Sequence, residues 1–433
     1  MRFAVFKFVR RQDSMRNFVA ILFGMGSQII IQLMSIPLFL YFFSVKDYAI
    51  WVISLNIAQF ANFIDLGTIT ANQNAFSYLN KRDKKFEISQ RISQSLNLLT
   101  ANLGILIILC VVEQLIFDNI VNILLVISFG ISVYVQNLFG LVEATKRMNG
   151  QNSLGLNLAS SARLIEFALY ATVTICGVSN LLIVSIVGTI AKFLFFWIIE
   201  SRDKQITAAE PFRSIDFLLI KNMSKSGFPY ALTKLSDVIA LSGVVLILQN
   251  RLSPIELLLF VSFRTFLRLG LQLSNIINFT FYFEMSKNWT ESKYSRFKRN
   301  VKLNSWSSFI VASILIVGYS VLGRSLFSHW THNQFDLPEK ILHSGLFYLI
   351  ILVFSQSQKI KFHAINANLR VSSISCFSTF VSLVILGVNK GFSDISQVFI
   401  LMGIAEIVSI LLVQLQSSSV LQQVFVNRKN GLE

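Results

Sequence analysis

Apolar stretches of about 20 residues recur from Phe18 almost to the end of this 433-residue chain. A helix rises about 1.5 Å per residue, so each stretch is long enough to cross the ~30 Å hydrocarbon core of a bilayer. Charge clusters and turn residues divide the chain into about twelve such spans. The predicted spans are 18–43, 48–76, 92–112, 121–142, 153–176, 181–200, 227–250, 256–284, 302–323, 341–358, 371–388 and 395–416. We therefore expect an all-α polytopic membrane protein.

Composition agrees with this prediction. The chain is 54% hydrophobic and only 14% charged, with a mean hydropathy of +0.62, which is too apolar for a soluble domain. The first apolar run is much longer than the core of a signal peptide, so we expect it to remain as the first span. Cys110, Cys176 and Cys376 each fall in an apolar segment, which favours packing over a disulfide framework.

Lysine and arginine are distributed unevenly between the two sides of the predicted spans. Most of the 38 basic residues fall at the N-terminus and in alternate connections. The opposite side has only Lys46, Arg251, Arg324, Lys340 and Lys390. The positive-inside rule places the richer side, with both termini, in the cytoplasm. The net charge of +16 therefore reflects topology and contact with anionic lipid, and we expect no nucleic-acid partner.

A short pattern occurs once in each half of the chain, with an offset of 203 residues. The matched pairs are Phe60 and Phe263, Phe63 and Phe266, Leu66 and Leu269, Gly67 and Gly270, and Asn72 and Asn275. Each copy lies in the second of six spans, which predicts two six-helix bundles related as parallel repeats. The predicted parts are a first bundle (1–200), a cytoplasmic amphipathic linker (201–226), a second bundle (227–416) and a cytoplasmic tail (417–433).

Five cations lie inside predicted spans, namely Arg163, Lys192, Lys234, Arg264 and Arg268. Arg264 and Arg268 are one turn apart and too deep for both to reach water, so we expect something anionic or wet opposite them. The planar guanidinium suits phosphate oxygens, which makes a pyrophosphate headgroup a sensible guest. Lys192 lies nearer the cytoplasmic end, where partial snorkelling is expected.

Carboxylates also occur at depth. Glu166 lies three residues after Arg163, and Asp237 lies three residues after Lys234, so each pair shares a helical face. Asp65 occupies the position in the first repeat that Arg268 occupies in the second, and Glu406 stands alone in the last span. Each carboxylate is a candidate either for structural charge pairing or for ion coupling.

The sequence contains no phosphate-binding G-x-x-x-x-G-K-[ST] loop and no nucleophile or triad pattern. His329 and His332 have no further ligands nearby in the sequence. We expect neither a metal nor a cofactor, and a transporter rather than an enzyme. A membrane polysaccharide polymerase or glycosyltransferase remains an alternative.

Three segments resemble one family. Asp47-Tyr48-Ala49-Ile50-Trp51, Phe63-Ile-Asp-Leu-Gly67 and Gly227-Phe-Pro229, together with the twelve predicted spans, look like Wzx-type O-antigen flippases. These form the polysaccharide-export branch of the MOP (multidrug/oligosaccharidyl-lipid/polysaccharide) superfamily. Ala49 departs from the glycine usual at that position.

The resemblance implies a transporter of lipopolysaccharide or related polysaccharide biosynthesis. The expected substrate is an undecaprenyl-pyrophosphate-linked oligosaccharide, moved from the inner to the outer leaflet of the bacterial inner membrane by ion-coupled alternating access. The cationic cavity of the family maps onto Arg163, Lys234, Arg264 and Arg268. A polysaccharide polymerase and a chain-length regulator are expected partners. A MATE-like multidrug exporter and a lipid II flippase are the alternatives with the same fold.

Overall fold

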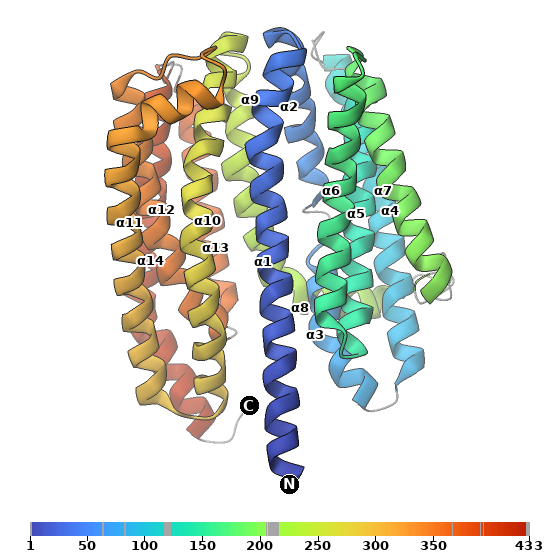
Figure 1. Ribbon diagram of the computed structural model, residues 1–433. Helices are drawn as coiled ribbons and strands as arrows, with labels where there is room; N and C mark the ends of the chain where they lie inside the picture. The colour runs from blue at the N-terminus through green and yellow to red at the C-terminus, as the bar shows by residue number, and fades with distance from the viewer. Residues whose placement is uncertain are drawn as a thin grey trace. The chain divides into compact units, whose positions relative to one another are not determined.

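The computed structural model describes residues 2–62, 65–81, 84–116, 123–204, 206, 216–365, 367–389, 391–392 and 394–429. These residues are almost entirely helical and include no strand (Figure 1). They divide into two compact units, Met1–Ala231 and Leu232–Glu433, which are described separately below.

The first unit contains α1 (Arg2–Phe42), α2 (Val45–Gln59), α3 (Thr68–Lys81), α4 (Lys85–Ile116), α5 (Ile123–Met148), α6 (Asn152–Ile175), α7 (Leu181–Asp203) and most of α8 (Phe217–Val238). Helices α5, α6 and α7 pack against one another (Figure 1). Buried aromatic and aliphatic side chains such as Phe76, Phe139 and Phe196 join α3, α5 and α7 in one core.

The second unit begins at the end of α8. It continues through a short π-helical segment (η3, Ile239–Gly243), α9 (Val244–Leu248), α10 (Pro254–Thr290), α11 (Tyr294–Trp330), α12 (Glu339–Ala364), α13 (Asn368–Val388) and α14 (Ile395–Lys429). Helix α10 packs against α11 and α12, and α14 packs against α12 and α13.

Apart from 48–76, the predicted spans fall on these helices wherever the structure describes their residues. Ten helices in the described part of the chain are long and apolar enough to cross a membrane. The predicted linker 201–226 is described only in part, and its residues 217–226 belong to α8, which continues without interruption to Val238. The proposed boundaries between bundles, linker and tail therefore stay predictions.

The second predicted span, 48–76, is interrupted. Helix α2 ends at Gln59, a 3-10 turn covers Phe60–Asn62 (η1), and α3 starts at Thr68. Leu66 and Gly67 have φ values of 47° and 71°, which no right-handed helix accommodates. The Asp65 carboxylate accepts a hydrogen bond from the Gly67 amide at 3.1 Å, and the Asp65 carbonyl accepts one from Thr68 at 2.9 Å. These contacts stabilise the start of α3.

Gly67 lies directly against a second glycine, Gly227 in α8. A Cβ atom built on Gly67 would lie 2.1 Å from the Gly227 carbonyl oxygen, and one built on Gly227 would lie 2.6 Å from the Gly67 carbonyl carbon. Two backbones approach this closely only where neither has a side chain. The sequence segments ending at Gly67 and beginning at Gly227 thus meet in the first unit.

Candidate functional site

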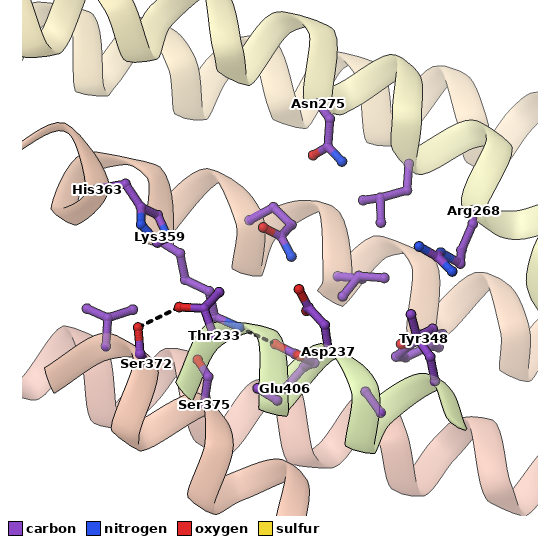
Figure 2. A pocket seen from close by; sticks show the side chains of 17 residues that line it. Thr233, Asp237, Arg268, Asn275, Tyr348, Lys359, His363, Ser372, Ser375 and Glu406 are labelled. Carbon is purple, nitrogen blue, oxygen red and sulfur yellow. Dashed lines mark hydrogen bonds and ion pairs between the residues drawn. The ribbon is translucent and has the colours of Figure 1, made fainter. Parts of the chain in front are cut away.

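The second unit contains a polar cavity of about 290 Å³. Side chains from α8, α10, α12, α13 and α14 line it, and many of them are polar or charged (Figure 2). The ionisable side chains lining the cavity are Asp237, Arg268, Tyr348, Lys359, His363 and Glu406. Because these helices are apolar enough to span a membrane, the cavity brings polar groups together where lipid would not solvate them.

Helical periodicity explains how each element supplies several lining residues. Helix α12 contributes Tyr348, Leu352, Gln356, Lys359 and His363, which recur every three or four positions and so share one face. Helix α10 contributes Arg268, Leu271 and Asn275 in the same manner. Figure 2 shows Arg268 and Tyr348 toward one end of the cavity and His363 toward the other.

Glu406 has a cationic partner in this cavity. The Lys359 ammonium lies 3.0 Å from Oε2 of Glu406, and the Ser355 hydroxyl donates to the same oxygen at 2.5 Å. The side chains of Lys359 and Glu406 are only 11% and 17% exposed. The expectation that Glu406 stands alone is therefore wrong, because its partner comes from the neighbouring helix α12 and is invisible along the sequence of α14.

Asp237 and Arg268 line the same cavity without such partners. In the described part of the chain neither side chain has a hydrogen bond or an ion pair, although each lies within electrostatic range of the other. Asp237 is accessible because it faces the cavity, as Figure 2 shows. Lys234, the neighbour of Asp237 in sequence, is not among the lining side chains.

Arg264 lies one turn from Arg268 on α10, but its side chain has different surroundings. Its side chain is 5% exposed and its Nη1 donates a 2.6 Å hydrogen bond to the carbonyl oxygen of Leu241. Leu241 lies inside the π-helical segment, where the usual ladder of backbone hydrogen bonds is altered. The guanidinium also lies 5.2 Å from the centre of the Phe260 ring. Arg264 thus supports helix packing, and only Arg268 of the pair faces the cavity.

The charged residues predicted in the first unit form a different cluster. Glu166 forms an ion pair with Lys192 at 2.9 Å and accepts hydrogen bonds from Ser132 and from Tyr170, the latter at 2.7 Å. Lys192 is 3% exposed, so the expectation that it snorkels is wrong. Helix α6 packs against both α5 and α7. Helix α5 supplies Ser132 and α7 supplies Lys192, so the lysine is buried where the three helices meet.

Arg163 and Asp65, the other charged residues predicted in the first unit, do not take part in the Glu166–Lys192 ion pair. The Nε of Arg163 is buried without a hydrogen-bonding partner among the described residues, and Glu143 and Glu166 lie within electrostatic range. Asp65 is fully buried and caps α3 as described above. The predicted residues are therefore distributed over several places, and Asp237, Arg268 and Glu406 are the three that line one cavity.

Lys359 and Gln356 are cavity residues that the sequence interpretation missed. The predicted tenth span, 341–358, ends one residue before Lys359, which leaves this lysine outside the predicted spans. The sequence does contain a signal for both residues, namely a run of positions spaced three or four residues apart that share one helical face. These positions are Tyr348, Leu352, Gln356, Lys359 and His363. No group of histidine, cysteine or carboxylate side chains in the described part of the chain is arranged to hold a metal ion.

Comparison with known proteins gives similarity in structure only. No family model matches the chain and no curated protein matches it. The lipid II flippase MurJ in an inward closed conformation superposes with a TM-score of 0.66 at 14% identity, covering 92% of this chain and 87% of MurJ. An inward-facing multidrug resistance MATE transporter of the MOP superfamily superposes with a TM-score of 0.61 at 16% identity, covering 91% of this chain and 99% of the transporter.

A third similar structure is a MOP superfamily transporter from Pyrococcus furiosus, described as having a binding pocket of reverse polarity. It superposes with a TM-score of 0.62 at 14% identity, covering 92% of this chain and 93% of that transporter. At these identities the likeness establishes the fold. The predicted all-α polytopic class is confirmed, and the chain has the fold of MOP superfamily transporters.

Proposed function

We propose that this protein is a flippase for a lipid-linked oligosaccharide. In this proposal an undecaprenyl-pyrophosphate-linked repeat unit moves from the inner to the outer leaflet of the bacterial inner membrane by alternating access. The observation that carries the proposal is the cavity of the second unit, where Arg268 has no hydrogen bond or ion pair to the described protein.

An unpaired arginine inside a membrane-spanning helix is costly, by about 3 kcal/mol or more at the centre of the bilayer. The cost falls when the cation faces water or an anionic or polar guest. A purely apolar cargo would gain nothing from the polar lining of this cavity. We therefore assign Arg268 to contact with the polar, sugar-bearing part of the substrate, whereas the pyrophosphate-headgroup roles of Arg163 and Lys234 stay predictions.

The transporter fold favours transport over glycan synthesis. One structure with this fold is a lipid II flippase, so the fold is compatible with lipid translocation. For ion coupling we favour Asp237 over Glu406, because Asp237 faces the cavity unpaired while Glu406 is neutralised by Lys359.

Export of cationic compounds is the second candidate function. The unpaired carboxylate of Asp237 and the likeness to multidrug MATE transporters favour it. In that case Asp237→Asn would sensitise cells to a cationic dye such as ethidium and would leave surface glycan unchanged.

The test is complementation of a strain lacking the gene. We expect Arg268→Ala to abolish surface glycan and to cause lipid-linked repeat units to accumulate, while the protein still inserts in the membrane. Arg324→Ala is the matched control, because Arg324 is exposed, forms its ion pair with Asp336 at 2.9 Å and is not among the residues that line the cavity. Normal surface glycan in the Arg268→Ala strain would contradict the proposal.

A further inference from the structure

The charges that line the cavity of the second unit balance. Arg268 and Lys359 are cations, and Asp237 and Glu406 are carboxylates. Lys359 and Glu406 already neutralise each other at 3.0 Å, and Asp237 lies within electrostatic range of Arg268. A pyrophosphate placed here would add negative charge to a lining whose two cations are already matched by two carboxylates, and burying excess charge carries a large desolvation penalty. The charge balance favours an uncharged polar guest.

Side chains in the cavity lining that have unused hydrogen-bonding groups indicate which kind of uncharged guest fits. Asn275, Gln356, Asp237 and Arg268 all line the cavity, and none of their side chains has a hydrogen bond within the described part of the chain. An amide offers two donors and an acceptor, a carboxylate offers acceptors, and a guanidinium offers donors. Neighbouring hydroxyl groups both donate and accept, so they satisfy this mixture. A phosphate has few donors to offer, and a quaternary ammonium has no acceptor.

An aromatic ring completes the lining. Tyr348 is 6% exposed and packs against Phe399 with ring centroids 6.0 Å apart, which holds it in place at the cavity wall. Figure 2 shows Tyr348 beside Arg268, with Asp237 nearer the middle. An apolar ring face bordered by polar side chains suits a molecule with both C–H and O–H surfaces.

The size of the cavity limits the guest. A volume of about 290 Å³ is near the lower end for ligand pockets. It corresponds to roughly ten water molecules at about 30 Å³ each, which is room for about one or two sugar rings. A whole oligosaccharide or a polyprenyl chain does not fit.

We infer that this cavity is a saccharide subsite that binds one or two uncharged sugar units of the transported lipid and excludes the pyrophosphate. The inference rests on the proposed flippase function and adds to it a site of substrate selection. Gln356 and Asn275 supply hydrogen bonds to sugar hydroxyls, and Tyr348 supplies the apolar wall. The glycan that the protein accepts is then selected in the second unit.

Equilibrium binding to purified protein in lipid nanodiscs tests the inference. The probes are undecaprenyl pyrophosphate and the same lipid carrying one N-acetylglucosamine or one galactose. The variants are Gln356→Ala and Asn275→Ala. Gln358→Ala is the matched control, because Gln358 lies on the same helix but hydrogen-bonds to Ser305 and Lys361 outside the cavity.

We expect the wild-type protein to bind at least one sugar-bearing lipid more tightly than the bare lipid. Each cavity variant should lose about threefold to tenfold in affinity for that sugar-bearing lipid, as expected for one neutral hydrogen bond, and nothing for the bare lipid. Gln358→Ala should change neither affinity.

Two results overturn the subsite while leaving the flippase proposal standing. One is equal loss for the bare and the sugar-bearing lipids, which would place the pyrophosphate in the cavity. The other is wild-type binding that is indifferent to the sugar. Binding of neither class of lipid would instead refute the proposed function, and the subsite with it. Loss of ethidium binding in Asp237→Asn, with no effect of sugar, would make the cavity a cation site.

Discussion

At the scale of the residue, Arg264 and Arg268 show how neighbours on one helix acquire different roles. Arg264 bonds to the Leu241 carbonyl, while Arg268 faces the cavity. Sequence depth and spacing drew attention to both arginines, but the spacing could not assign their partners. The Leu241 carbonyl that accepts from Arg264 lies in η3, and Asp237, within electrostatic range of Arg268, lies in α8. Both neighbours are set by packing between helices.

Arg264→Ala is therefore expected to destabilise the fold, because it removes the charged hydrogen bond to the Leu241 carbonyl and the contact with the Phe260 ring. The expected cost is about 1–3 kcal/mol, visible as a lower melting temperature in detergent. Arg268→Ala should lower the melting temperature less, since the Arg268 side chain makes no hydrogen bond or ion pair to the described part of the chain. Equal losses in the two variants would contradict this division of roles.

The Glu166–Lys192 pair gives a second prediction at this scale. Lys192→Met alone leaves a buried carboxylate without its cation, which costs about 3–5 kcal/mol in comparable cases. Adding Glu166→Gln should restore most of the lost stability, because the amide oxygen still accepts hydrogen bonds from Ser132 and Tyr170. Thermal unfolding of both single variants and the double variant measures the coupling. Additive losses would show that the two groups act independently.

At the scale of the element, hydrophobic runs predicted where the spans lie but not where their backbone departs from the α-helix. The break between α2 and α3 depends on positive φ values at Leu66 and Gly67, and η3 depends on a change in hydrogen-bond register. Neither leaves a trace in hydrophobic periodicity. The repeated pattern illustrates the limit, because its first copy lies at this break while its second lies within the continuous helix α10.

The contact between Gly67 and Gly227 is predicted to tolerate no side chain. Gly67→Ala combines a positive φ with an overlap against the Gly227 carbonyl. We therefore expect the free energy of unfolding to fall by about 1–3 kcal/mol or more. Gly227→Ala should behave similarly. Gly26→Ala is the control, because nothing lies within 4 Å of its Cβ position, and alanine should raise helix stability there by about 0.5–1 kcal/mol. A melting temperature unchanged by Gly67→Ala would contradict the contact.

At the scale of the whole molecule, the composition and the apolar runs were sufficient to predict the fold class, because a bilayer permits few alternatives for a chain this apolar. The sequence does not predict which charged residues pair and which face the cavity, because this arises only when five helices meet around it. The residues concerned are Asp237, Arg268, Lys359 and Glu406. Which side of the membrane each connection faces still rests on the positive-inside rule.

Cys176 offers a direct test of that orientation. It is exposed and follows the last residue of α6, which should face away from the cytoplasm if the N-terminus is cytoplasmic. In a Cys110→Ser, Cys376→Ser background, a membrane-impermeant maleimide added to intact spheroplasts should label the protein, and Cys176→Ser should abolish the labelling. Labelling only after permeabilisation would invert the predicted topology.

Transfer of an intact lipid-linked glycan between leaflets tests the central claim most directly. Purified protein in liposomes would be given undecaprenyl pyrophosphate carrying a labelled oligosaccharide, and the glycan reaching the opposite leaflet would be measured with an impermeant enzyme. We predict transfer well above that of protein-free liposomes, falling at least tenfold in Arg268→Ala and unchanged in Arg324→Ala. Transfer no faster than in protein-free liposomes, or formation of a glycosidic bond in place of transfer, would contradict the account.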